Sequence, residues 1–239
     1  YLAKLEEKGY IKKESQKGES QEEDCQKIAN YIDQISQAIL SENDEALTYI
    51  KLLTDEIQNP KDHYDEVIKD KDFLAFLFHI LAETPQPRSI RFKLIKLLYS
   101  MIDSYESLHS IVIDIGFLPF LFHVIVDVNN EIDCPRESIF ELIIAENEIF
   151  STVYYALNVL MNLYYSNESL FCDFVSFSKL DEVYFFICES LNKEFPKEIL
   201  SDKKWKKAIL RRIEIHSQIQ KGIVVLLSKF SLFQLPFED

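Results

Sequence analysis

The basic island of this acidic chain spans residues 202–212 and holds its single tryptophan, Trp205. On a helix, at about 100° per residue, the cations of this run fall on one side, and Trp205, Ile209 and Ile213 fall on another. An amphipathic cationic helix can bind an acidic segment of a partner protein, a phosphate-bearing ligand or a membrane surface. The alternative is a solvated last helix whose charges balance acidic neighbours while Trp205 anchors it to the core. The candidate partner-binding residues of this helix are Lys203, Lys204, Lys207 and Arg211.

Aromatic and asparagine side chains share one face in each of two apolar stretches. Within a sector of about 80° on a helical wheel, residues 148–165 carry Ser151, Tyr155, Asn158, Asn162 and Tyr165. In residues 89–103, the sector opposite the leucines carries Phe92, Lys96, Tyr99 and Asp103. Asparagine can bond an extended peptide backbone through both a donor and an acceptor, and tyrosine provides rigid contact area. The two faces indicate capture of a peptide or partner; a solvated helix face with incidental aromatics is the alternative.

No residue pattern typical of an enzyme, a cofactor site or a metal site stands out. The four glycines are too scattered to form a phosphate-cradling loop, and no nucleophile stands beside a base in a turn motif. The four cysteines form no C-x-x-C pair, so we expect ordinary reduced thiols. His79 and His123 occupy equivalent positions of a repeat, which duplication alone explains. We therefore expect a non-enzymatic protein with no cofactor and no metal.

The net charge of −14 argues against general nucleic-acid binding, because phosphate neutralisation supplies most of that affinity. The most lipid-like stretch, residues 110–128, carries Asp114 and is broken at Gly116 and Pro119, so we expect no transmembrane segment. The first residues mix lysine and glutamate without an apolar run, and they begin at Tyr1, which suggests a fragment. We expect a cytoplasmic location, with the nucleus as the alternative.

The elements that would carry these faces are helices. Ile28, Ile32, Ile35 and Ile39 recur at helical spacing, and a second helix is expected before Pro60. Residues 73–81 recur as residues 117–125 with six of nine positions identical, at a spacing of 44 residues. A weaker third copy begins at Leu180. The central unit predicts helices over residues 106–115 and 117–126 around a turn at Gly116, and the third helices of two units over residues 89–103 and 148–165. The last helix is expected from about Ser201, as its N-cap, to residue 232.

Two motifs resemble the armadillo family. Residues 116–121 read Gly-Phe-Leu-Pro-Phe-Leu and resemble the family's G-x-[IL]-P-x-L entry to its second helix. Residues 156–163 read Ala-Leu-Asn-Val-Leu-Met-Asn-Leu and resemble its A-A-x-A-L-x-N-L third helix. The resemblance covers residues 45–232 and implies an all-α, armadillo/HEAT-like right-handed α-solenoid of about four repeat units.

In such stacks the third helices line the concave groove, so the resemblance places the partner-binding residues Phe92, Lys96, Tyr99, Tyr155, Asn158, Asn162 and Tyr165 there. In the nuclear-import branch a tryptophan stands four residues before the asparagine of the third helix. Here that position is Asn158, and Lys96 in the preceding unit. A receptor for basic localisation signals is therefore disfavoured.

The domain organisation expected is a charged flexible arm over residues 1–22 and an armadillo-like domain over residues 23–239. The domain carries an acidic insertion at about residues 127–148, either a structural elaboration or a docking element. Its apolar part could extend into the following helix or cap the groove. The leading function is an adaptor or scaffold subunit that binds a protein partner in the groove. The alternatives are an armadillo-type regulator of cytoskeletal (actin-nucleation or formin-like) or signalling machinery that grips a large complex with its cationic helix, and a helical enzyme with an unrecognised site. The partner's identity and the oligomeric state are left open.

Overall fold

The computed structural model describes residues 19–41, 43, 45–59, 61, 64–82, 86–128, 138–166, 180–191, 199 and 201–234. All regular secondary structure in these ranges is helical, which confirms the all-α prediction. The chain divides into two compact units, Tyr1–Phe117 and Leu118–Asp239, and each unit is described by itself. The predicted arm falls mainly on residues 1–18, which lie outside the described residues, and the first described helix begins at Glu19.

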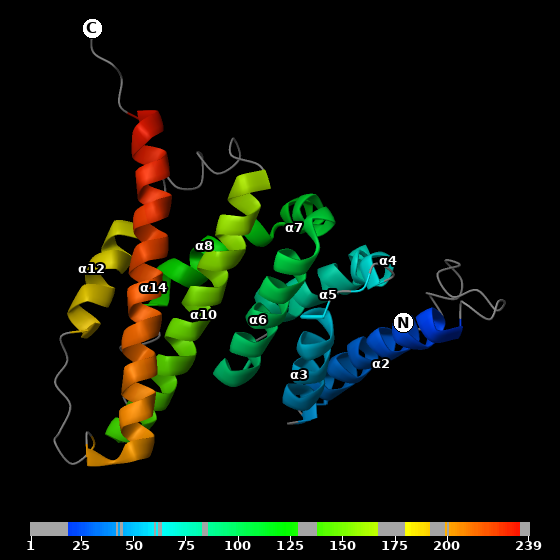
Figure 1. The fold of residues 1–239 in the computed structure, drawn as a ribbon, viewed down its shortest axis with the longest axis horizontal. Helices are drawn as coiled ribbons and strands as arrows, with labels where there is room; N and C mark the ends of the chain where they lie inside the picture. The colour runs from blue at the N-terminus through cyan, green and yellow to red at the C-terminus, as the bar shows by residue number, and fades with distance from the viewer. Residues whose placement is uncertain are drawn as a thin grey trace, which may run out of the picture. The chain divides into compact units, whose positions relative to one another are not determined.

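The first unit is built around helix α3 (Glu45–Ile57), which packs against both α2 (Glu19–Leu40) and α6 (Arg88–Ser104). The short helices α4 (Tyr64–Ile68) and α5 (Lys71–Ala82) follow α3 in the chain (Figure 1). The isoleucines predicted to share a face of α2 are 0–6% exposed, so that face forms part of the core. Asn43 caps α3, since its Oδ1 accepts a hydrogen bond from the Glu45 backbone at 3.0 Å.

A small polar network at the edge of this core joins α2, α3 and α4. Lys27 Nζ lies 2.6 Å from Glu56 Oε2, and the Tyr64 hydroxyl donates to Glu56 Oε1 at 2.8 Å. The hydrogen bond from Lys27 lowers the pKa of Glu56, and burial raises the pKa of Tyr64 to about 12. Lys61 Nζ pairs with Asp24 at 2.7 Å. The Glu56 carboxylate is therefore held in its charged form by partners from neighbouring elements.

The turn predicted at Gly116 is confirmed. Helix α7 (His109–Ile115), preceded by the 3-10 turn η1 (Glu106–Leu108), ends at Gly116, whose φ of 103° lies in the left-handed region. Helix α8 (Phe117–Val126) begins directly afterwards. The Phe117 ring meets Phe78 of α5 edge-on at 5.0 Å, so the turn brings the first residue of α8 back onto the first unit's core.

All three copies of the sequence repeat form short helices. The first two copies lie in α5 and α8, and the third forms α12 (Leu180–Leu191). His79 and His123, at equivalent positions of the first two copies, are both exposed. The repeat therefore reproduces a local helix and its solvent-facing histidine.

The second unit contains two long helices, α10 (Ile139–Ser166) and α14 (Lys203–Gln234), with α12 packed against α14 (Figure 1). Contacting residues on α10 and α14 differ by 65 or 66 positions, as in Phe140 with Trp205 and Phe150 with His216. A constant difference means that the two helices run parallel and in register.

The apolar part of the predicted insertion forms the start of α10, since that helix runs unbroken from Ile139 into the stretch predicted to begin at Glu148. Residues 129–137 of the insertion lie outside the described residues.

Within the described ranges, no single helix has the length and apolar character needed to cross a membrane. The segments Glu106–Ile115 and Phe117–Val126 reach that length and composition only when taken together, and the chain bends by 81° between them.

Candidate functional site: a groove between two parallel helices

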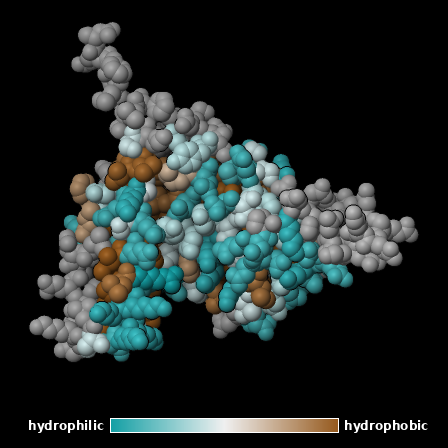
Figure 2. Space-filling view, in the orientation of Figure 1, coloured by the Kyte–Doolittle hydropathy of each residue, from teal (hydrophilic) through white to brown (hydrophobic). Residues whose placement is uncertain are grey.

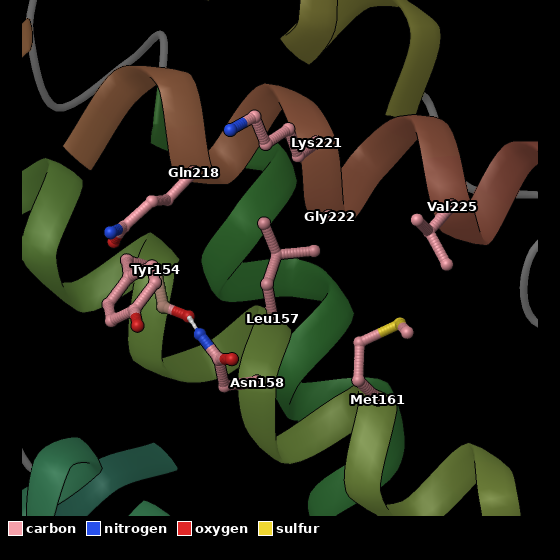
Figure 3. A pocket seen from close by; sticks show the side chains of 8 residues that line it. All are labelled: Tyr154, Leu157, Asn158, Met161, Gln218, Lys221, Gly222 and Val225. Atoms are coloured by element: carbon pink, nitrogen blue, oxygen red, sulfur yellow. Dashed lines mark hydrogen bonds between the residues drawn. The ribbon is translucent and has the colours of Figure 1, made fainter. Parts of the chain in front are cut away.

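A groove of about 410 Å³ opens between α10 and α14 in the second unit (Figure 3). Its walls come from successive turns of the two helices, because parallel helices in register keep matching turns side by side. The residues that line it are Tyr154, Leu157, Asn158, Met161, Gln218, Lys221, Gly222 and Val225.

The floor of the groove is apolar. Leu157 and Met161 of α10 face Val225 of α14 across it (Figure 3). Gly222 lies between them and has no side chain. A Cβ built at this position would lie 3.7 Å from Leu157 Cδ1, an ordinary van der Waals distance. Val225 is 37% exposed, so apolar surface of the groove remains in water.

The rim of the groove is polar, and its side chains make few hydrogen bonds with other described residues. Asn158 Nδ2 donates to the Tyr154 carbonyl at 2.7 Å and makes no other hydrogen bond with a described residue, so its Oδ1 is left as an acceptor. On the opposite wall, Gln218 and Lys221 make no hydrogen bond or ion pair with any residue that the structure describes. The rim therefore offers an acceptor, an amide and a cation to a ligand.

Asn158 is the only residue predicted for the partner-binding groove that also lines this one. Tyr155 is half-buried and stacks edge-on with Tyr154 at 5.1 Å. Burial and the neighbouring Tyr154 raise the pKa of Tyr155, and the charge of Arg211 on α14 opposes them. On the helical wheel of α14, Arg211 falls about 20° from Gln218, which lines the groove, so it lies along the same side of the helix. Further along α10, Asn162 is half-buried and Tyr165 is 64% exposed beside Tyr164.

The remaining predicted groove residues, Phe92, Lys96 and Tyr99, lie half-buried on α6 in the first unit. Because α6 and α10 belong to separately described units, a groove shared by these helices stays a prediction.

The cationic face at the start of α14 is exposed as its sequence predicts. Lys203, Lys204, Lys207 and Arg211 are all exposed, as is Lys206 between them. None of these side chains forms an ion pair with another described residue. The N-cap predicted at Ser201 is wrong by one position: Asp202 Oδ1 accepts the Lys204 backbone hydrogen bond at 2.8 Å, and α14 begins at Lys203. An aspartate at this position also neutralises part of the positive end of the helix dipole.

Trp205 anchors this part of α14 against α10. Its ring lies 4.7 Å from that of Phe140 and packs on the cluster formed by Ile143, Ile199 and Ile209. Ile213, expected on the same apolar side, is 46% exposed. The residue that points inward is instead its neighbour Arg212.

Arg212 forms a fully buried ion pair that sequence reasoning missed. Its Nε lies 2.8 Å from Glu146 Oε2, and each side chain is 1% exposed. His216, also fully buried, places Nδ1 2.7 Å from the Arg212 carbonyl and its ring 3.8 Å from Phe150. Burial lowers the pKa of Arg212, and the Glu146 carboxylate opposes that shift.

A signal for this pair was present in the sequence. Arg212 stands three residues after Ile209 and seven before Ile219, which places it in the apolar stripe of its helix, and Glu146 stands three residues after Ile143. A cation in one stripe and an acid in another indicate a buried pair between the two helices.

Among the described residues, no group of three or more His, Cys, Asp or Glu side chains is placed to hold a metal ion. No family model, curated protein or solved structure matches this chain.

Proposed function

We propose that this chain is a non-enzymatic protein-binding module whose α10–α14 groove receives a short segment of a partner protein. The observation that carries this proposal is the open apolar floor at Leu157, Met161 and Val225. The polar groups of the rim above it can each form further hydrogen bonds. Small apolar sites with a few convergent polar groups are typical of side-chain recognition.

The size of the groove sets the kind of ligand. Burying one leucine- or phenylalanine-sized side chain contributes about 1.5–3 kcal/mol, whereas micromolar affinity requires about 8 kcal/mol. An anchor in the groove is therefore not enough, and the segment must also bond to the rim. Asn158 Oδ1 accepts from a peptide N–H, and the Gln218 amide both donates and accepts. A peptide backbone supplies the matching groups at every residue.

We propose further that the two units belong to one armadillo/HEAT-like array that acts as an adaptor subunit, in the cytoplasm or the nucleus. Supporting this are the three repeat helices α5, α8 and α12 and the tight turn at Gly116. Each repeat helix is short and strongly apolar, as expected of elements that cover their apolar face with a neighbouring repeat.

A peptide library displayed against the purified chain tests the groove. Val225 and Val224 are adjacent exposed valines on α14, and only Val225 lines the groove, so Val225→Gln and Val224→Gln form a matched pair. We expect peptides enriched on the wild type to lose at least tenfold in affinity on Val225→Gln and to bind Val224→Gln unchanged, with equal helical circular dichroism in both variants. Equal binding to both variants, or no enriched peptide, would rule the groove out as a binding site.

A second candidate function is favoured by the cationic face of α14: a regulator that grips an acidic surface of a larger cytoskeletal or signalling complex. Its cations are exposed and form no ion pair with a described residue. In this case, charge reversal at Lys203, Lys207 and Arg211 abolishes partner binding while Val225→Gln leaves it intact.

A further inference from the structure

The cations of α14 continue from its start to the groove along one side of the helix. At about 100° per residue, Lys203, Lys207, Arg211, Gln218, Lys221 and Val225 all fall within about 80° of one another. The only acid in that sector is Glu214, and all these side chains except Val225 are polar or charged. We refer to Lys203, Lys207, Arg211 and Lys221 as the cationic stripe. The stripe is therefore a locally positive surface on a protein whose net charge is −14.

The stripe and the groove form one surface. Arg211 falls about 20° from Gln218 on the helical wheel of α14, and Gln218 and Lys221 are both part of the groove rim. No member of the stripe forms an ion pair with a described residue. Figure 2 shows hydrophobic and hydrophilic patches in alternation over the region where Figure 1 draws α14. A ligand held in the groove therefore meets positive charge on the same side of the helix.

We propose that the partner segment is acidic, with one apolar anchor in the groove and carboxylates bound along the cationic stripe; this inference rests on the function proposed above. Arg211 and Gly222 are separated by about 16 Å along α14 at 1.5 Å per residue. An extended peptide covers that distance in about five residues at 3.3 Å each. The segment therefore carries one carboxylate beside its anchor, opposite Lys221. Two further carboxylates lie about five and about seven residues from the anchor, opposite Arg211 and Lys207 in turn.

A protein segment fits this surface better than a membrane does. The exposed apolar side chains Leu210, Ile213 and Val224 lie toward the flank of the stripe that is turned away from the groove. A helix that lies on a lipid surface instead presents its apolar side chains to the bilayer between the cations. The rim groups Asn158 and Gln218 are backbone-bonding groups for which an acyl chain has no counterpart.

The test uses fluorescence polarisation with labelled dodecapeptides and the full chain. The first peptide contains one phenylalanine, one glutamate beside it, and glutamates five and seven residues away in a serine–glycine background. It is made in both chain directions. The second replaces its glutamates by glutamine, and the third replaces phenylalanine by alanine. The protein variants are Arg211→Glu/Lys221→Glu, Val225→Gln and the control Lys51→Glu/Lys71→Glu, which makes the same charge change at exposed positions of the first unit.

We expect the acidic peptide to bind the wild type and the control at least tenfold more tightly than the other two peptides, with affinity that falls as salt rises. We expect Arg211→Glu/Lys221→Glu to lose at least tenfold. If library peptides depend on Val225 yet show no preference for acids, the acidic partner is wrong and the groove proposal stands. If no peptide distinguishes Val225→Gln from the wild type, the groove proposal itself is wrong. Binding of anionic phospholipid vesicles through Arg211 and Lys221, without peptide binding, would replace the protein partner by a membrane surface.

Discussion

Replacing Arg212 by methionine is expected to destabilise the second unit by about 3–5 kcal/mol, although it removes a charge from an apolar core. Arg212 and Glu146 are each 1% exposed with 2.8 Å between their charged atoms. Methionine keeps most of the apolar stem of arginine, so the expected loss comes mainly from the carboxylate that is left buried without its cation.

The magnitude follows from the geometry. Two unit charges at 2.8 Å attract by about 6 kcal/mol at an effective dielectric constant of 20. Removing both ions from water costs several kcal/mol each, so the complete pair contributes little relative to apolar side chains of the same size. We therefore expect the double variant Glu146→Leu/Arg212→Met to be no less stable than the wild type, while each single substitution is strongly destabilising.

The pH dependence distinguishes the two single variants. In Arg212→Met, the buried Glu146 carboxyl escapes the cost of a lone buried charge only by binding a proton, so the variant loses stability as the pH rises. Lowering the pH from 7 to 5 then recovers up to about 2.7 kcal/mol, at 1.36 kcal/mol per pH unit. Glu146→Leu leaves an arginine that stays charged, so its loss is constant over this range. The nearby His216 is present in every variant, and its contribution cancels in the difference to first order.

Urea unfolding at several pH values measures these differences. Trp205 is the only tryptophan and lies in α14, so its fluorescence reports the second unit, and far-ultraviolet circular dichroism reports both. A cost below about 1 kcal/mol for Arg212→Met, or one independent of pH, would mean that the pair is solvated in solution and that the reasoning from burial is wrong.

Three further outcomes are expected. Glu56→Gln should cost about 0.5–1 kcal/mol at pH 7, because the Lys27 hydrogen bond lowers the pKa of Glu56. A lowered carboxyl pKa gives stability that is present above the unfolded value near 4.5 and is lost as the pH falls through the lower folded pKa. Urea unfolding at pH 7 and at pH 3 should therefore show the stability difference between wild type and variant disappear at the lower pH. Gly116→Ala should lower the unfolding free energy by about 1–2 kcal/mol, since φ of 103° is strained for any side chain, and an unchanged melting temperature would contradict this. Gly222→Ala should instead raise it by about 0.5–1 kcal/mol, because this glycine lies inside α14 and its new Cβ meets Leu157 at an ordinary 3.7 Å; thermal unfolding of the two alanine variants side by side checks both signs.

Much of the helical structure was predictable because it rests on local chemistry. The repeat predicts helices over residues 106–115 and 117–126 around a turn at Gly116, and η1, α7 and α8 occupy those positions. The predicted helices over residues 89–103 and 148–165 correspond to α6 and to the later part of α10. Asn158 was assigned to a binding face from its position on a helical wheel, and it lines the groove.

The other wall of the groove and the buried ion pair depend on which helices pack together. A charged side chain considered within its own helix belongs in water, and Glu146 was accordingly counted with an acidic insertion. The parallel register of α10 and α14 places Glu146 against Arg212, and it brings Gly222 and Val225 opposite Leu157 and Met161. Periodicity along a chain fixes which face of each helix is apolar. Which other helix covers that face depends on packing between residues more than sixty positions apart. Those contacts exist only once the tertiary structure has formed.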